Sequence, residues 1–63
     1  MPYIQIEASP MSKEKKVELI KGLTEVASSI LNISQSAFTV VIRENNPDNV
    51  GVGGIPLSER LKK

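Results

Sequence analysis

The chain lacks cysteine and histidine altogether. The absence of cysteine excludes disulfides and thiol nucleophiles, and the absence of histidine excludes imidazole bases. Together the two absences remove the commonest zinc sites, and we expect no metal. A chain of 63 residues buries only about 60% of the surface that its unfolded form exposes, so its own core is marginal. We therefore expect one domain over residues 1–63 that is supported by self-association.

The chain also lacks a large excess of charge of either sign and any long apolar run. Eight basic and seven acidic residues give a net charge of +1, far from the basic balance of a nucleic-acid-binding module. A lysine-rich segment is interrupted by acidic residues, which is typical of a solvated helix face; its members are Lys13, Glu14, Lys15, Lys16, Glu18, Lys21 and Glu25. No signal-peptide or membrane-spanning pattern is present. We expect no nucleic-acid partner, no membrane association and a cytoplasmic location.

Pro2 follows the initiator and begins a strand pattern that runs to Ala8. Removal of Met1 would leave Pro2 as a secondary amine at the end of that strand. An α-amino group titrates near ~8, and an apolar pocket or a nearby cation lowers its pKa, which would make the amine a general base. The alternative is structural, because proline is tolerated at the first residue of a strand, where its missing N–H costs no ladder bond.

The sequence predicts a β-α-β unit. The first strand places Ile4, Ile6 and Ala8 on one face and polar residues on the other. Ser12 is a good N-cap for a helix of about 19 residues that begins near Lys13, and Asn32 closes it. Its apolar stripe comprises Leu19, Ile20, Leu23, Val26, Ala27, Ile30 and Leu31. Residues 37–44 form a second strand, parallel to the first, and one face and both edges of the sheet remain uncovered.

The last third of the chain is rich in turn residues. Residues 45–49 form a loop, and the glycines of residues 50–54 favour a small hairpin; a phosphate loop is disfavoured because no Gly-Lys-Ser/Thr follows. Residues 55–63 predict a turn of helix started by Pro56, followed by a basic tail. The expected fold class is α+β, with two parallel strands, one covering helix and a C-terminal hairpin.

Several of these features occur together in one known family. The set consists of Pro2 opening a strand, Gln5 and Ile6 within it, Ser12-x-Glu14, Leu19-Ile20, Glu44, and Gly51-x-Gly53-Gly54. Over all 63 residues the chain resembles the 4-oxalocrotonate tautomerase family. The resemblance implies a cofactor-independent isomerase assembled as a homohexamer of three dimers, with active sites built across subunits. In that family the amino-terminal proline moves a proton within a small-molecule enol or 2-hydroxydienoate to give a 2-oxo acid.

Of the residues that the family uses, only Pro2 is retained. The first family arginine falls within residues 10–12, where no cation stands, the second falls on Thr39, and an aromatic residue falls on Val50. Arg43 lies on the same strand face as Thr39, about 13 Å further along, so it can substitute only across a subunit boundary. Arg60 is another candidate, with Tyr3 and Lys13 as further polar contributors. The replacements favour smaller, less charged substrates such as arylenolpyruvates.

The sequence leaves three alternatives open. The first is a catalytically silent structural oligomer of the same fold, which would tolerate Pro2→Ala. The second is a family member that hydrates or dehalogenates its substrate. The third is a small dimeric DNA-binding module, which the near-neutral charge disfavours.

Overall fold

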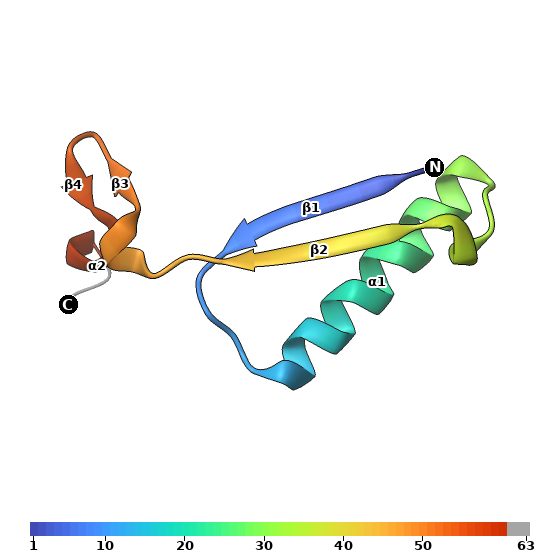
Figure 1. Cartoon of the computed structure of the whole chain (residues 1–63), viewed down its shortest axis with the longest axis horizontal. Coiled ribbons are helices and arrows are strands. Elements are labelled where there is room, and N and C mark those ends of the chain that lie inside the picture. The colour runs from blue at the N-terminus through green and yellow to red at the C-terminus, as the bar shows by residue number, and fades with distance from the viewer. Residues whose placement is uncertain (61–63) are drawn as a thin grey trace.

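The structure is a computed structural model that describes residues 1–60; the predicted basic tail, residues 61–63, lies outside the described part. A β-α-β unit is followed by a short hairpin and a last turn of helix (Figure 1). The elements in chain order are β1 (Tyr3–Ala8), α1 (Lys13–Leu31), the 3-10 turn η1 (Gln35–Ala37), β2 (Thr39–Glu44), the 3-10 turn η2 (Pro47–Asn49), β3 (Gly51–Val52), β4 (Ile55–Pro56) and α2 (Leu57–Arg60). This architecture confirms the predicted α+β class.

Strands β1 and β2 form a two-stranded parallel sheet, as predicted. Tyr3 pairs with Thr39 at one end of the register and Ala8 pairs with Glu44 at the other. Main-chain hydrogen bonds extend the pairing beyond both ends of the strands. The Thr39 N–H donates to the Pro2 carbonyl over 3.1 Å, and the Asn45 N–H donates to the Ala8 carbonyl over 2.8 Å. The register therefore fixes Pro2 beside the start of β2.

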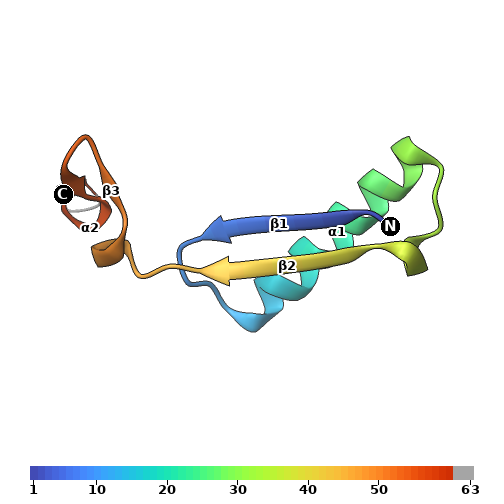
Figure 2. The same cartoon turned by 45° about the horizontal axis from the view of Figure 1, so that its top comes forward.

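Helix α1 has the boundaries that its capping residues predict. The Ser12 side chain accepts a hydrogen bond from the Lys15 N–H, which satisfies one of the free donors of the first turn. Asn32 ends the helix in the left-handed conformation, with φ 58°, and its N–H donates to the Ser28 carbonyl. The helix runs along one face of the strand pair (Figure 2). On that face Ile4, Ile6 and Ala8 are half-buried, as the alternating pattern predicts.

Two predicted boundaries were wrong in detail. The second strand begins at Thr39 rather than at residue 37, because Ser34 accepts a hydrogen bond from the Ser36 N–H and turns Gln35–Ala37 into a 3-10 turn. Pro56 does not start the last helix. It pairs with Gly51 as the final residue of β4, where a missing N–H is tolerated at a sheet edge, and α2 begins one residue later.

The hairpin turns at two glycines. Gly53 and Gly54 have φ angles of 62° and 83°, a conformation that L side chains rarely adopt and that a tight hairpin turn requires. The Leu57 N–H donates to the Val50 carbonyl over 2.6 Å and closes the base of the hairpin. The hairpin and α2 extend beyond the end of the sheet that lies opposite the N terminus (Figure 1).

The described chain has no closed hydrophobic core, since none of its residues is fully buried. Its radius of gyration is 14.9 Å, whereas a compact domain of this length has about 11 Å. Large apolar side chains stand open to solvent, among them Val26, Ile30 and Leu31, which are 61%, 77% and 53% exposed. Within residues 1–60 no helix is both long enough and apolar enough to cross a membrane.

Candidate active site

Pro2 and Thr39 are the two predicted site residues that the structure brings together. Pro2 is half-buried immediately before β1, and its carbonyl accepts the Thr39 N–H. Thr39 is the exposed first residue of β2. Met1 is 97% exposed, so its removal costs no packing within the chain. Removal of Met1 would therefore leave Pro2 as a free amine at the end of the sheet where β2 begins with Thr39.

Tyr3 pairs in register with Thr39 and shares its sheet face, but its phenol is directed along the strand. The Tyr3 hydroxyl donates to Gln5 Oε1 over 3.2 Å. Residues two apart on a strand are separated by about 6.6 Å, so the hydroxyl lies on the side of Tyr3 that faces away from Pro2. Tyr3 therefore presents its ring at this site, and its side chain is 57% exposed.

The other three predicted site residues lie toward the opposite end of the sheet. Arg43 is exposed and pairs in register with Glu7, about 13 Å along the strand from Thr39. Val50 follows η2, and Arg60 is the last residue of α2. A strand of six residues spans about 20 Å, so one chain cannot bring these residues to its own Pro2. The candidate site is incomplete within a single protomer.

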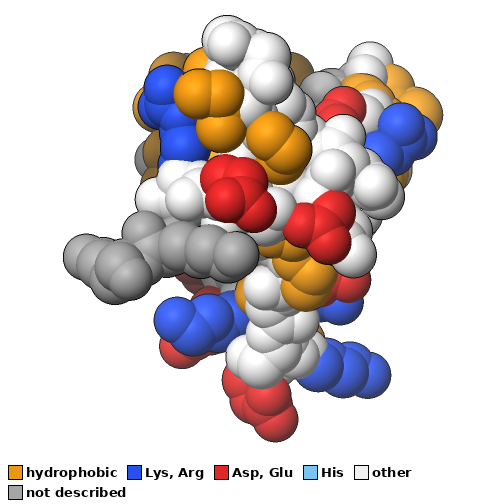
Figure 3. All heavy atoms as spheres, turned by 90° about the vertical axis from the view of Figure 1, so that its left-hand side faces the viewer, with side chains coloured by type: hydrophobic (Ala, Val, Ile, Leu, Met, Phe, Trp, Pro, Cys, Tyr) orange, Lys and Arg blue, Asp and Glu red, His pale blue; other side chains and the backbone are white. Residues whose placement is uncertain are grey.

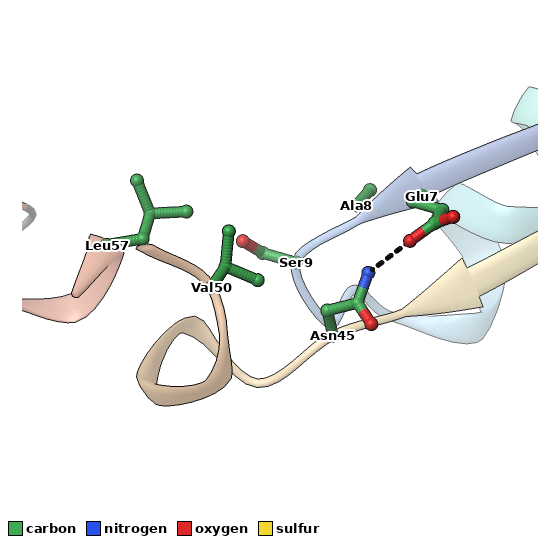
Figure 4. A pocket seen from close by; sticks show the side chains of 6 residues that line it. All are labelled: Glu7, Ala8, Ser9, Asn45, Val50 and Leu57. Atoms are coloured by element: carbon green, nitrogen blue, oxygen red, sulfur yellow. Dashed lines mark hydrogen bonds between the residues drawn. The ribbon is translucent and has the colours of Figure 1, made fainter. Parts of the chain in front are cut away.

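Val50 contributes to a groove of ≈320 Å³ between the end of the sheet and the hairpin. The groove is lined by Glu7, Ala8, Ser9, Asn45, Val50 and Leu57. Figure 4 shows Val50 and Leu57 on the hairpin side, the Ser9 side chain directed toward Val50, and Glu7 and Ala8 at the end of β1. The Asn45 side-chain amide donates to Glu7 Oε1 over 3.1 Å, which holds that carboxylate at the rim. The groove thus presents an apolar wall and a carboxylate, without a cation.

Glu44 is a structural residue of the site region whose contacts the sequence did not reveal. Its Oε2 accepts the Met11 N–H over 2.9 Å, and its Oε1 lies 3.0 Å from the Lys16 ammonium. These two contacts, the main-chain bond first, hold the pKa of the Glu44 carboxyl below its usual range. They attach the loop after β1 to the end of β2. One sequence signal pointed to these contacts. Alternation along β2 places Glu44 on the same strand face as Val40 and Ile42, the face toward the helix.

The loop after β1 also borders a shallow groove of ≈400 Å³ against the first turns of α1. Met11, Lys15, Glu18 and Leu19 line it. Among the described residues no carboxylate lies within ion-pair distance of Lys15. Elsewhere in residues 1–60 the acidic side chains nowhere gather into a group that could hold a metal ion. Around Pro2 itself, the nearby described side chains are the Thr39 and Tyr3 hydroxyls and apolar groups, and removal of Met1 would add the Pro2 amine.

Comparison with known proteins gives consistent matches over nearly the whole chain. The family model described as "Tautomerase enzyme" matches residues 2–60. A probable tautomerase from Campylobacter jejuni is 39% identical over 56 residues, which cover 86% of this chain and 82% of the relative. A probable tautomerase from Dickeya dadantii is 32% identical and covers 100% of this chain and 97% of the relative.

Solved structures share the fold as well. A heterohexamer 4-oxalocrotonate tautomerase from Chloroflexus aurantiacus superposes with a TM-score of 0.89 at 28% identity, over 98% of this chain and 100% of that one. DmpI from Archaeoglobus fulgidus gives 0.84 at 35% identity, over 90% and 98% of the two chains. Since the family model and these relatives each span most of the sequence, the chain belongs to the tautomerase family.

Proposed function

We propose that this protein is a cofactor-independent isomerase in which Pro2, freed by removal of Met1, is the general base. The observation that carries the proposal is that the family match begins at residue 2, the half-buried proline at the open end of β1. The amine takes the proton from the hydroxyl of an enol, the carbonyl forms as the double bond shifts, and the protonated amine returns the proton to carbon. The product is an isomeric 2-oxo acid, with no net gain or loss of atoms.

The pKa of the amine decides whether this chemistry works near neutral pH. A free α-amino group titrates near ~8, and desolvation disfavours its protonated form and lowers that value. In the single chain Pro2 is only half-buried. A second copy that covers this end of the sheet would complete the desolvation and produce a base suited to neutral pH.

Self-association is therefore part of the proposal, with a homohexamer as the expected assembly. Three observations support it: the chain has no closed core in its described part, its apolar side chains are exposed, and the C. aurantiacus relative is a heterohexamer. In such an assembly Arg43, Val50 or Arg60 of one copy would meet Pro2 of another. These residues would then supply the cation and the apolar wall that Pro2 lacks within its own chain.

The test is a measurement of mass and rate on the same preparations. Intact-mass measurement gives the fraction of chains that lack Met1, and we expect turnover of an enol substrate to rise in proportion to that fraction. The control is a form in which Met1 is retained, because an acylated Pro2 has no basic nitrogen. Equal turnover by the retained and the processed forms would exclude the amine mechanism.

A second candidate function is a catalytically silent oligomer of the same fold. It is favoured by one observation, namely that uncharged Thr39 and aliphatic Val50 stand where the family resemblance places an arginine and an aromatic residue. This candidate expects normal assembly without proline-dependent turnover. The same mass-and-rate measurement separates it from the isomerase.

A further inference from the structure

Acidic and basic side chains are distributed unevenly along the molecule. Residues 1–6 and 26–42 contain no Asp, Glu, Lys, Arg or His. Both segments start from or pass through one end, called the Pro2 end here, and reach along the strands as far as the Ile6–Ile42 pair. The N terminus, the last turns of α1, η1 and the start of β2 gather at the Pro2 end in both ribbon views (Figures 1 and 2). Residues 7–9 and 43–60 form the hairpin end. Viewed from the hairpin end, both acidic and basic side chains lie across the surface (Figure 3).

The charges of a chain lie too far along the sheet to act strongly on its own Pro2. Glu7 is five residues from Pro2, about 16 Å along the strand, and Arg43 is about 13 Å from Thr39. The Debye length at physiological ionic strength is about 8 Å, so exposed charges at these distances are largely screened. The last ionisable residue of α1, Glu25, is an acid and offers no attraction to an anion.

The side chains at the Pro2 end are apolar or neutral and polar. Ile30 and Ile33 are 77% and 39% exposed, and Thr39 and Tyr3 stand open on the sheet face. Such a surface suits an aryl or alkyl group and can donate neutral hydrogen bonds. It does not compensate for removing a carboxylate from water.

A cation supplied by a second copy would arrive together with an acid. Five of the six basic residues in the described chain have an acidic residue as their neighbour in register, in sequence or in an ion pair: Arg43 and Glu7, Arg60 and Glu59, Lys13 and Glu14, Lys15 and Glu14, and Lys16 and Glu44. The sixth, Lys21, lies about one helical turn from both Glu18 and Glu25. Such pairs are close to neutral as units. One carboxylate of a substrate can still pair with one guanidinium of the second copy. A second carboxylate would lie against the Pro2 end, where it finds no cation.

We infer that the substrate is a monocarboxylate enol with an apolar remainder, and that dicarboxylates are disfavoured. The inference rests on the proposed function, since it concerns the substrate of the Pro2 site. The single carboxylate is bound by a cation of a second copy, and the apolar remainder lies against the Pro2 end. An unpartnered second carboxylate lowers affinity by roughly 10- to 150-fold, the range expected for one lost charge-assisted contact.

Binding of two unreactive planar acids tests the charge preference without any turnover. Cinnamate carries one carboxylate and an aryl group, whereas muconate carries two carboxylates, and neither has an enol proton. Titration of the processed protein, followed by calorimetry, should give a Kd for cinnamate at least ~10-fold below that for muconate. Equal or tighter binding of muconate would overturn the inference, as would a failure of both acids to bind.

The variant Thr39→Arg adds a cation at the Pro2 end and should raise muconate affinity by about tenfold or more. Glu14→Gln is the matched control, because it adds one positive charge at the exposed first turn of α1 and should leave both Kd values unchanged. An equal gain in both variants would mean that net charge, and not the Pro2 end, sets the preference.

Turnover of phenylenolpyruvate and 2-hydroxymuconate by the unmodified protein then separates the two proposals. Preferential binding of cinnamate without proline-dependent turnover of either enol would refute the isomerase and leave the charge preference standing. Proline-dependent turnover with a higher kcat/KM for the dicarboxylate would support the isomerase and refute the charge preference.

Discussion

The two ends of the protomer divide the chemistry of the proposed site between them. The Pro2 end holds the proposed base in a neighbourhood without acidic or basic side chains, whereas the hairpin end holds Arg43 and Arg60, each next to an acid. The six-residue strands of the sheet keep the two ends about 20 Å apart. Neither end is a complete site on its own, and this separation is why we propose that a second copy completes the site.

The ends also differ in how they are held together. At the Pro2 end, main-chain pairing fixes Pro2 against Thr39, but apolar side chains such as Ile30 remain exposed. Toward the other end of the sheet, side chains form the connections: Glu44 joins Met11 and Lys16, and Asn45 joins Glu7. We expect substitutions at the first end to alter chemistry and assembly, and those at the second to alter binding and local stability.

The largest expected effect is that of Pro2→Ala. Alanine keeps a basic α-amino group but not the secondary amine held in the proline ring, so we expect kcat for an enol substrate to fall by at least ~100-fold, the lower range of what a positioned general base contributes. Steady-state kinetics on fully processed protein measure it. Circular dichroism and size exclusion should be unchanged, because the Pro2 carbonyl that accepts the Thr39 N–H is retained. Full activity in this variant would contradict the assigned base.

The next effect concerns assembly through the exposed stripe of α1. Ile30 is 77% exposed in the single chain, and full burial of such a side chain contributes about 1.5–3 kcal/mol. Ile30→Asp should therefore raise the dissociation constant of the oligomer by roughly 10- to 150-fold or more.

Light scattering coupled to size exclusion measures the mass in solution, which should fall toward that of one chain, 6.9 kDa, as the oligomer dissociates. Ser29→Asp is the matched control, since it adds the same charge at an exposed neighbour. Equal dissociation in both variants would show that added charge, and not loss of the apolar stripe, disrupts assembly.

Arg43→Ala probes the hairpin end directly. Loss of a guanidinium that meets a substrate carboxylate should lower kcat/KM for phenylenolpyruvate by roughly tenfold or more. The matched variant Arg60→Ala tests the second candidate cation in the same assay. If neither variant changes kcat/KM, the cation comes from another part of the chain, and the groove lysine Lys15 becomes the residue to test.

The smallest expected effect is the pH dependence that Glu44 contributes. Its carboxyl has a lowered pKa in the folded chain, so its contacts stabilise the fold above the ordinary value of 4.5 and are lost as pH falls through the lowered pKa. Glu44→Gln should lower the urea midpoint slightly at pH 7 and reduce its decline toward pH 3. Glu14→Gln, without such contacts in the described chain, should retain the decline.

Much of the fold could be predicted because local signals agreed with one another. Ser12 and Asn32 marked both ends of α1, and alternation placed Ile4 and Ile6 on the helix face. The start of β2 was missed because a side-chain hydrogen bond from Ser34, which propensity does not register, competes with the extended conformation.

The candidate site was less predictable, because it depends on where segments end up in space. The position of Pro2 beside Thr39 follows from strand register, which a single sequence does not fix in advance. The Glu44 contacts join residues 33 apart in the chain, and no local pattern indicates such a pairing. The sequence predicted a candidate base, Pro2, and candidate cations, but it could not place them at opposite ends of one molecule.

Mixing two impaired variants tests most directly the central claim that base and cation come from different copies. Pro2→Ala and Arg43→Ala proteins are dissociated, combined in equal amounts and reassembled, and turnover of phenylenolpyruvate is measured. Random mixing should restore about a quarter of the sites, and hence about a quarter of the unmodified activity, because each site draws one residue from each of two neighbours. Activity that stays at the mean of the two separate variants, although mixed oligomers are present by native mass measurement, would contradict the claim.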